Sequence, residues 1–312
     1  MTAELTFPAI GFGTAPLATA PAWNPGEPIP EAQAIEALQY AYEQGITYFD
    51  TAPNYVKGLA EHRTGLLVGQ LPRESITIAT KVGFDISGDE VVRDYSRDGV
   101  LRSLEGSLKR LNVDYVDILH VHDPDFHFEA VIEETFPALA ELRSQGVIKA
   151  IGAGMNQWEM LERFAHHADF DCFMIASRYT LLEQNALPLL NLCHEKDINI
   201  IAASIYNSGI LATGSRIDSP RYNHGQAPEN IINRVAEIEA VCEQFSVPLL
   251  VAANQFPLAH ATVKTIVVGF QTTNEIQACL QATGHAIPPA FWDALKEKNL
   301  ILSEAPTPKA NT

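Results

Sequence analysis

The sequence predicts an α/β fold, a single-domain (β/α)8 barrel of the TIM type with long loops at the C-terminal face. Three observations predict it. Short apolar, β-branched runs alternate with amphipathic segments almost throughout the chain. The apolar runs are continuous, which suits parallel strands buried on both faces. A chain of 312 residues is also within the range of one such barrel.

Eight apolar runs are interpreted as strands. They are "AIGFGTA" (9–15), "ITYFD" (46–50), "SITIATKV" (75–82), "YVDILHV" (115–121), "VIKAIGAG" (147–154), "CFMIAS" (172–177), "INIIAAS" (198–204) and "TIVVGF" (265–270). A doubly wound sheet would need a GxGxxG turn after the first of them, and "GFGTAP" does not supply it. Eight strands, each followed by a helix, predict the barrel.

Helical segments fill the gaps between these strands. Residues 31–45 form an amphipathic segment that ends on Gly45, as helices commonly do. Asp98 is a plausible N-cap for 98–112, and 131–146 again ends in glycine. We expect one barrel domain over 1–303 and a flexible tail over 304–312.

Three long loops follow the first, third and seventh strands, at 15–30, 84–99 and 207–230. All three belong to the end of the barrel where the strands finish. Barrel enzymes place their active sites at that end. The loops therefore predict a site for a small-molecule substrate there.

Composition excludes several classes of function. The net charge is −17, which argues against nucleic acid or an anionic membrane as partner. The four cysteines are widely spaced, so neither a disulfide framework nor a structural zinc site is indicated. No signal peptide and no apolar run of about 20 residues is visible. We expect a cytoplasmic protein, and its oligomeric state cannot be read from the sequence.

Ionisable side chains stand at the ends of neighbouring predicted strands. Asp50 closes the second strand, and Tyr55 follows five positions later. Lys81 closes the third strand and His122 the fourth. Each alone has a structural interpretation, such as a helix N-cap or a lysine that reaches to solvent. Because strand ends of one barrel converge on its mouth, the four together favour a catalytic site.

These residues lie in motifs that resemble the aldo-keto reductase superfamily over nearly the whole chain. The motifs are "GFGTAPL", "FDTAPNY", "ATK", "SLKRLNVDYVDILHVHDP", "GVIKAIGAG" and "TIVVGF". The tetrad of that family falls on Asp50, Tyr55, Lys81 and His122. "TAPL", "VHDPD", "RYTLLEQ" and "NSGILATG" further resemble the branch of D-threo-aldose 1-dehydrogenase, L-fucose dehydrogenase, plant L-galactose dehydrogenase and pyridoxal 4-dehydrogenase.

The resemblance implies an NAD(P)-dependent oxidoreductase that oxidises the C1 hemiacetal of an aldose to a lactone. L-fucose, L-galactose and D-arabinose are candidate substrates. Reduction of an aldehyde or ketone, or oxidation of pyridoxal, at the same site are the alternatives. A more distant alternative is a barrel that binds the cofactor without catalysis, and the complete tetrad argues against this alternative.

The resemblance also implies a role for each tetrad residue. Tyr55 exchanges a proton with the substrate oxygen, and an ammonium about 4 Å away would lower its pKa from about 10 toward neutrality. Asp50 keeps Lys81 charged and oriented. His122 orients the substrate oxygen.

Substrate contacts are expected from the long loops and strand ends. In the motif "HDP", Asp123 replaces the tryptophan of many relatives that reduce apolar carbonyls. A carboxylate there suits a polar substrate, although a turn-former before Pro124 is the structural alternative. The candidate substrate residues are Trp23, Phe84, Asp123 and Trp158.

The implied cofactor site spans several strand ends. Met155 stands beside Asn156 where serine is common, and Ala176 stands where glutamine is common. Tyr206 is the aromatic residue nearest to the position of the tyrosine that stacks on nicotinamide. The candidate cofactor residues are Gly13, Thr14, Asp50, Asn156, Tyr206, Asn207, Ser208, Gly209, Leu211, Gly269, Gln271 and Glu275.

The residues after the eighth strand predict which dinucleotide is preferred. Gly269 and Glu275 stand where NADP-specific relatives carry Lys and Arg, which grip the 2′-phosphate. Glu275 would repel that phosphate and could accept hydrogen bonds from ribose hydroxyls. We therefore expect NAD to be preferred, with NADP possible. A first-turn residue that complements a helix dipole is the structural alternative for Glu275.

The pair His120 and His122 also resembles the HxH strand end of metal-dependent barrel hydrolases. Those enzymes need further ligands after the fifth, sixth and eighth strands, where this chain has "GAGMNQ", "IASRYT" and "VVGFQT". Two histidines fall short of the three protein ligands of a usual catalytic zinc. We therefore expect no metal, with His120 as a polar residue inside the barrel and His127 at the surface.

Overall fold

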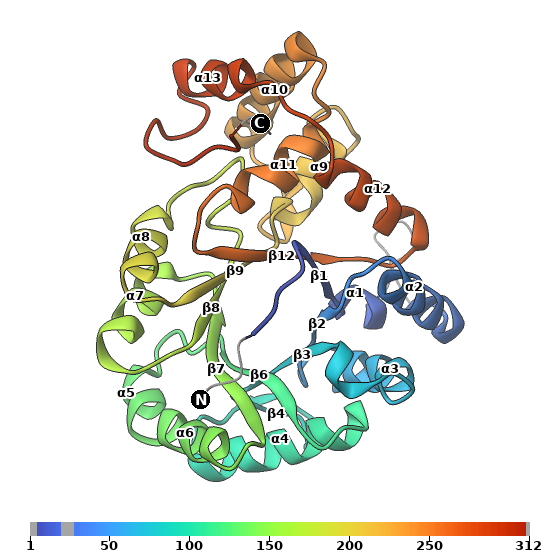
Figure 1. Cartoon of the computed structure of the whole chain (residues 1–312), viewed down its shortest axis with the longest axis vertical. Helices are drawn as coiled ribbons and strands as arrows, with labels where there is room; N and C mark the ends of the chain where they lie inside the picture. Colours follow the sequence, from blue (N-terminus) through green and yellow to red (C-terminus); the bar gives the residue numbers. More distant parts are fainter. Residues whose placement is uncertain (1–4, 20–27, 310–312) are drawn as a thin grey trace.

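The computed structural model describes residues 5–19 and 28–309, and it confirms the predicted barrel. Eight parallel strands close in the order β1-β12-β9-β8-β7-β6-β3-β2 (Figure 1). Every predicted apolar run contains or overlaps one of them. The strands are β1 (Ile10–Gly13), β2 (Tyr48–Asp50), β3 (Thr77–Val82), β6 (Val116–His122), β7 (Ile148–Met155), β8 (Cys172–Ala176), β9 (Asn199–Ala203) and β12 (Val263–Gly269).

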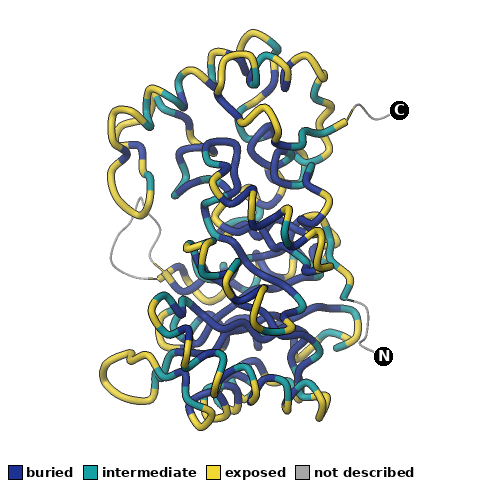
Figure 2. The backbone as a smooth tube through the Cα atoms, turned by 90° about the vertical axis from the view of Figure 1, so that its left-hand side faces the viewer, coloured by how far each residue is buried: buried dark blue, intermediate teal, exposed yellow. Residues whose placement is uncertain are grey.

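Helices surround the barrel (Figure 1), and Figure 2 shows that the buried residues, in dark blue, gather in the middle of the molecule. The larger helices are α2 (Glu31–Glu43), α3 (Leu59–Val68), α4 (Arg97–Leu111), α6 (Phe136–Ser144), α7 (Trp158–His167), α8 (Leu187–Glu195), α10 (Glu229–Phe245), α11 (Leu249–Leu258), α12 (Thr273–Thr283) and α13 (Pro289–Glu297). The shorter ones are α1 (Ala15–Ala18), η1 (Arg73–Ser75), α5 (Phe128–Ala130), η2 (Val131–Thr135), η3 (Asn207–Gly209) and α9 (Ile210–Thr213).

Helix α2 shows why such segments form where they do. Its buried positions, Ala34, Ala37, Leu38 and Ala41, recur at the spacing of one helical face. Gly45 follows with a φ of +87°, a conformation that glycine adopts without steric cost. The predicted end of this helix is thus confirmed.

Two helix predictions need correction. Ser96 caps α4, and its side chain accepts a hydrogen bond from the Gly99 N–H; Asp98 lies within the first turn. The single helix expected over 131–146 is instead a series of α5, a π-helical turn (η2) and α6. Pro137, in the first turn of α6, has no N–H to donate to the carbonyl four residues earlier, which explains the break.

The barrel interior is packed with side chains from alternate strand positions. His120 and Tyr48 are fully buried there. A Cβ on Gly152 would collide with the His120 ring, and a Cβ on Gly11 would collide with the Tyr48 ring. These two glycines therefore make room for large interior side chains. His120 lies inside the barrel, as expected.

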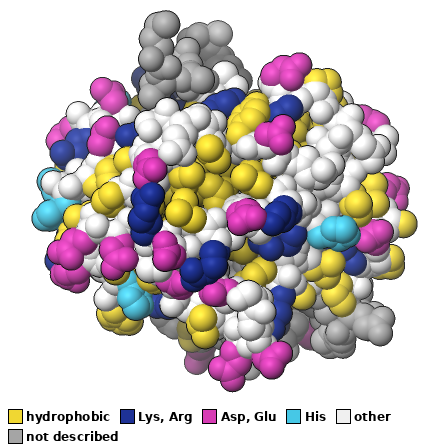
Figure 3. Space-filling view, turned by 90° about the horizontal axis from the view of Figure 1, so that it is seen from below, with side chains coloured by type: hydrophobic (Ala, Val, Ile, Leu, Met, Phe, Trp, Pro, Cys, Tyr) yellow, Lys and Arg dark blue, Asp and Glu magenta, His cyan; other side chains and the backbone are white. Residues whose placement is uncertain are grey.

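The long loops carry two small hairpins, β4 (Phe84–Asp85) with β5 (Val92–Arg93), and β10 (Arg221–Tyr222) with β11 (Gly225–Gln226). In the segment expected to be a tail, Ala305 is buried, and 310–312 lie outside the described residues. No helix among the described residues is long and apolar enough to cross a membrane. The face in Figure 3 mixes acidic and basic side chains around an apolar patch.

Candidate active site

A cavity of about 720 Å³ opens where the barrel strands end. Its size is within the roughly 300–1,000 Å³ of most small-molecule sites. All four tetrad residues line it, from β2, the loop after β2, β3 and β6. The structure therefore brings together the side chains that the strand-end pattern singled out.

A buried ion pair lies at the centre of this group. The Lys81 Nζ is 2.6 Å from the Asp50 Oδ1 and also donates to the Thr51 carbonyl oxygen at 2.8 Å. The same ammonium lies 4.9 Å from the centre of the Tyr55 ring. The rings of Tyr55 and His122 meet edge to face with their centroids 5.9 Å apart. Phenol, ammonium, carboxylate and imidazole thus share one end of the cavity.

Strand β3 is held on both of its faces. Lys81 points into the barrel, whereas the adjacent Thr80 points outward and donates to the buried Glu61 on α3 at 2.6 Å. Glu61 also accepts a hydrogen bond from the Arg110 Nε of α4 at 2.7 Å. The position of the lysine is therefore fixed by Asp50 inside the barrel and by Glu61 outside it.

Burial and the ion pair together set the charges of the tetrad. Burial lowers the pKa of Lys81, but the Asp50 carboxylate and Tyr55 outweigh it, so the net pKa lies above its ordinary value. Burial raises the pKa of Asp50 more than Lys81 lowers it. Lys81 therefore remains an ammonium at neutral pH.

The expected net effect on Tyr55 is wrong in direction. Burial raises the pKa of the Tyr55 hydroxyl, and the opposing effect of Lys81 is smaller. The expectation counted the ammonium and left out the removal of water around the phenol. At neutral pH, Tyr55 is consequently a neutral phenol that can donate a proton.

The end of β6 is clamped by a single hydroxyl. The Tyr95 OH donates to the carbonyl oxygens of His122 at 2.7 Å and of Asp123 at 2.8 Å. Asp123 has a φ of +45°, lines the cavity, and places its Oδ2 3.7 Å from the His122 Nε2. Burial, and then Lys81, hold the pKa of His122 well below its ordinary value, so the imidazole is neutral. Asp123 serves both as a turn residue and as a polar wall of the cavity.

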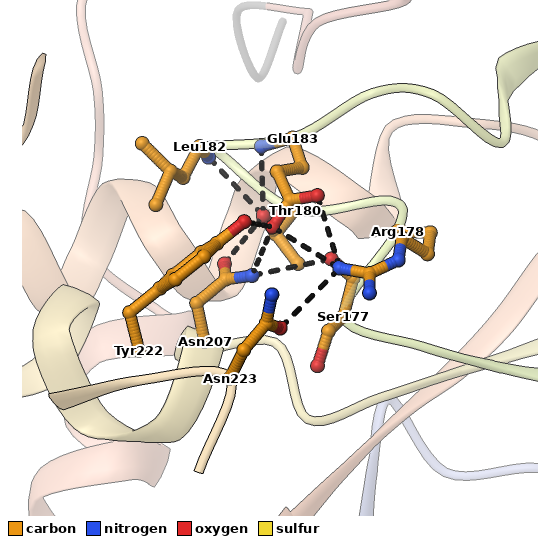
Figure 4. A network of polar contacts seen from close by, with 8 residues as sticks. All are labelled: Ser177, Arg178, Thr180, Leu182, Glu183, Asn207, Tyr222 and Asn223. Carbon is orange, nitrogen blue, oxygen red and sulfur yellow. Dashed lines mark hydrogen bonds and ion pairs between the residues drawn. The ribbon is translucent and has the colours of Figure 1, made fainter. Parts of the chain in front are cut away.

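Most of the expected cofactor residues line the cavity. Those that do are Gly13, Asp50, Asn156, Tyr206, Ser208, Gly209, Gly269, Gln271 and Glu275. Thr14 is buried next to the cavity and its N–H donates to the Asp50 carbonyl oxygen. The Asn207 side chain instead forms hydrogen bonds with Ser177, Thr180 and Glu183 (Figure 4). Leu211 lies in the apolar core. The structure therefore does not bring the side chains of Asn207 and Leu211 to the cavity.

At the far end of the cavity, the Glu275 carboxylate accepts hydrogen bonds from backbone N–H groups. Its Oε2 accepts from the N–H groups of Gln271 at 2.7 Å and Thr272 at 3.1 Å, as half of a capping box at the start of α12. The Gln271 amide donates to the Pro16 carbonyl oxygen at 2.9 Å. The capping geometry fits the structural alternative for Glu275, and the carboxylate still faces the cavity.

The wall after β8 and β9 is made of small residues. Ala176 pairs with Ala203 in the barrel register, and both line the cavity. The Tyr206 OH donates to the Asn254 Oδ1 at 2.7 Å, which anchors this tyrosine on α11. Tyr206 therefore lines the cavity with a fixed ring.

The expected substrate residues are only partly brought together. Asp123 lines the cavity, and the Phe84 ring packs edge to face against His122 at 5.4 Å between centroids. Trp158 begins α7 and packs, half-buried, against the core. Trp23 lies outside the described residues. His127 is half-buried, not at the surface, because its ring packs against Tyr95.

Sequence reasoning missed several residues that line the cavity. They are Asn54, Ser177, Arg221 and His224, among others. Asn54 could have been found because it precedes Tyr55 in "APNY". Arg221 and His224 lie in the long loop 207–230 without a motif, and only the β10–β11 hairpin turns them toward the cavity.

The cavity carries acceptors that no described side chain satisfies. Asp50 Oδ2 and Asn54 Oδ1 are buried and have no hydrogen-bond partner among the described residues. Buried oxygens of this kind usually have a donor. The amide and hydroxyl groups of a nicotinamide dinucleotide supply such donors, so the site fits that cofactor. Among residues 5–19 and 28–309, no three His, Cys, Asp or Glu side chains are arranged to hold a metal.

Comparisons with known proteins agree with this geometry. The model of a family described as "Aldo/keto reductase family" matches residues 9–300. D-threo-aldose 1-dehydrogenase from a Pseudomonas species is 36% identical, over 98% of this chain and 97% of that protein. Pyridoxal 4-dehydrogenase from Microbacterium luteolum is 34% identical, over 95% of each. L-galactose dehydrogenase from Arabidopsis thaliana is 30% identical, over 86% of this chain and 82% of that protein.

Solved structures share the fold at lower identity. An aldo-keto reductase from Bacillus halodurans, in its holo form, superposes with a TM-score of 0.77 at 23% identity, covering 96% of this chain and 94% of that one. Glycerol dehydrogenase from Gluconobacter oxydans gives a TM-score of 0.76 at 19% identity, covering 100% of this chain and 96% of that one. Both likenesses concern the fold alone.

Proposed function

The chain belongs to the aldo/keto reductase family of NAD(P)-dependent oxidoreductases, and from this premise we propose that it oxidises the C1 hemiacetal of an aldose to a lactone. The observation that carries the proposal is the cluster of Tyr55, His122 and the Lys81–Asp50 pair on one cavity. The likeness to D-threo-aldose 1-dehydrogenase supports an aldose as substrate.

In the proposed mechanism, Tyr55 is the residue that exchanges a proton with the substrate oxygen. The bound dinucleotide supplies the hydride acceptor. Lys81 stabilises the phenolate that forms whenever Tyr55 has lost its proton; at an effective dielectric near 20, a charge about 4 Å away contributes roughly 4 kcal/mol. Asp50 keeps that lysine charged and aimed at the phenol.

His122 has the complementary role of orienting the substrate oxygen. Its imidazole is neutral, because burial keeps its pKa well below the ordinary value. A neutral ring can donate one hydrogen bond to the substrate without adding a second buried cation near Lys81. Its edge-to-face contacts with Tyr55 and Phe84 hold the ring in place.

A polar substrate is supported by the wall around these groups. Asp123 places a carboxylate at the reacting end of the cavity, and a carboxylate accepts hydrogen bonds from hydroxyl groups. The Asp123 side chain is 39% exposed in the free protein, and an apolar aldehyde bound over it would remove water from the carboxylate without offering a hydrogen-bond partner, which costs free energy. Asp123 therefore favours a sugar over an apolar carbonyl compound.

We further propose that NAD is preferred over NADP. Gly269 offers no cation for a 2′-phosphate, and a side chain there would meet Pro16. Glu275 adds a carboxylate to the same end of the cavity. Both features disfavour an additional dianion. The ratio of kcat/KM with NAD to that with NADP tests this; equal or better use of NADP overturns it.

Two observations favour a second candidate, oxidation of pyridoxal or reduction of an aldehyde. Pyridoxal 4-dehydrogenase is nearly as similar to this chain as the aldose enzyme. Burial also keeps Tyr55 protonated, which suits the proton donor of a reduction.

A spectrophotometric screen separates these functions. NAD and NADP are offered with L-fucose, L-galactose, D-arabinose and pyridoxal, and NADH with simple aldehydes, while absorbance at the reduced-nicotinamide band is followed. We expect the highest kcat/KM with an aldose. Activity with pyridoxal or aldehydes alone replaces the proposal by the second candidate, and no activity with any of them overturns it.

A further inference from the structure

The β10–β11 hairpin brings a permanent positive charge to the cavity. Arg221, the first residue of β10, and His224, in the turn between β10 and β11, both line it. Among the described residues that line the cavity, Lys81 and Arg221 are the only lysine or arginine side chains. Lys81 is already paired with Asp50. Arg221 is therefore the cation that remains for an anionic ligand.

The hairpin is fastened to the barrel through a half-buried carboxylate, Glu183. The Tyr222 OH donates to the Glu183 Oε1 at 2.7 Å (Figure 4). The Asn207 Nδ2 donates to the same oxygen at 3.0 Å, and the Arg178 Nη1 lies 3.1 Å from the Oε2. One carboxylate thus joins the loop after β8, the turn after β9 and the hairpin.

A second set of contacts fixes the tip of the hairpin. The His224 N–H donates to the Ser208 Oγ at 2.9 Å, next to Gly209 on the cavity wall. The Arg221 Nη2 donates to the His224 carbonyl oxygen at 2.8 Å, so the guanidinium is held along the hairpin. Asn223 and His224 both have positive φ, which gives the tight turn that these contacts need.

We propose that Arg221 binds the phosphates of the dinucleotide, and that Glu183 and Tyr222 are positioning residues that hold its hairpin against the cavity. The inference rests on the proposed use of a nicotinamide dinucleotide. A guanidinium pairs with phosphate oxygens through charge-assisted hydrogen bonds. Because the network holds the hairpin in place before the ligand arrives, less conformational freedom is lost on binding.

Arg221 itself is tested by equilibrium binding. NADH is titrated into wild-type protein, Arg221→Gln and Arg221→Lys, and binding is followed by NADH fluorescence at several KCl concentrations. We expect Arg221→Gln to weaken NADH binding about tenfold and to reduce its salt dependence, because one phosphate contact is lost. Arg221→Lys keeps the charge and should restore part of the affinity. Unchanged affinity in Arg221→Gln overturns the inference.

The positioning residues are tested by the rate at which NADH dissociates. Stopped-flow displacement of NADH from Tyr222→Phe and Glu183→Gln should give dissociation several-fold faster than from the wild type, with kcat less affected than KM. Tyr222→Phe removes one hydroxyl and keeps the test available if Glu183→Gln does not fold. Dissociation at the wild-type rate from Tyr222→Phe argues against the fastening role and overturns it.

A matched control lies in the same loop. Arg216 is exposed, pairs with Glu243 at 2.8 Å and does not line the cavity. Arg216→Gln should leave NADH affinity and dissociation unchanged, and an equal loss there would overturn the assignment to Arg221. If the wild type binds neither NADH nor NADPH, the proposed function fails along with this inference. If it binds and turns over while the Arg221 variants match it, only this inference fails.

Discussion

Pro16 occupies the space that a side chain on Gly269 would need. A Cβ at Gly269 would lie 2.6 Å from the Pro16 Cγ, well inside van der Waals contact. Pro16 belongs to α1, directly after β1, and Gly269 ends the neighbouring strand β12. The cofactor end of the cavity is thus shaped by a proline and a glycine that depend on each other.

This packing predicts that a lysine at position 269 will not by itself confer use of NADP. Gly269→Lys should destabilise the protein by about 1–3 kcal/mol, as overpacking does, without raising kcat/KM for NADP. Adding Pro16→Gly relieves the clash and should recover stability. Urea denaturation and cofactor kinetics of the single and double variants measure both effects. A gain in NADP use by the single variant would contradict the packing argument.

Removing the Tyr55 hydroxyl should abolish most turnover. Loss of general acid–base catalysis typically costs a factor of about 10²–10⁴, so Tyr55→Phe should lower kcat by at least about a hundredfold. NADH affinity should change little, because the ring remains. Tyr40→Phe, on the half-buried face of α2, is the matched control and should keep wild-type kcat. Near-normal turnover in Tyr55→Phe would remove this residue from the mechanism.

The outline of this site was predictable, and its details were not. Continuous apolar runs fixed the eight strands, and strand-end position alone placed Asp50, Lys81 and His122 together. The sequence led us to expect a lowered pKa for Tyr55. Burial raises this pKa more than the nearby ammonium lowers it, and the sequence pattern does not reveal how deeply the hydroxyl is buried. The sequence pattern also does not reveal that the Asn207 side chain turns away from the cavity, into the network around Glu183.

Buried His120 should make the protein sensitive to acid. Burial, and then Lys81, lower its pKa from 6.5 to about 3. Between these values the unfolded chain binds a proton that the folded protein does not. Stability should therefore be full above pH 6.5 and fall as the pH drops toward 3, by up to about 1.4 kcal/mol per pH unit from this group.

Replacing this histidine tests the source of the acid sensitivity. His120→Leu should flatten the fall in urea-denaturation free energy between pH 6.5 and 4.5 relative to the wild type, because the variant has no proton to take up at this position. The exposed His166 on α7 provides the control, since His166→Leu should retain the wild-type slope. An unaltered slope in His120→Leu would assign the acid sensitivity to other groups.

Glu61 is expected to support both stability and activity from outside the barrel. Glu61→Gln keeps the shape of the side chain but weakens its bonds to Thr80 and Arg110. Hydrogen bonds to charged groups contribute about 1.5–3 kcal/mol each, so we expect a loss of that order in urea denaturation. Glu141, in an exposed ion pair with Arg97, provides a control that should change little when replaced by Gln. A variant as stable as wild type would contradict this role.

Because strand β3 is held on both faces, the position of Lys81 depends on residues that lie outside the cavity. No residue of α3 or α4 lines the cavity, yet Glu61 and Arg110 are bonded in series to Thr80, which is the neighbour of Lys81 in the chain. A substitution at position 61 or 110 should therefore lower the turnover rate as well as the stability of the protein. A redesign of the outer helices should therefore retain Thr80, Glu61 and Arg110 together.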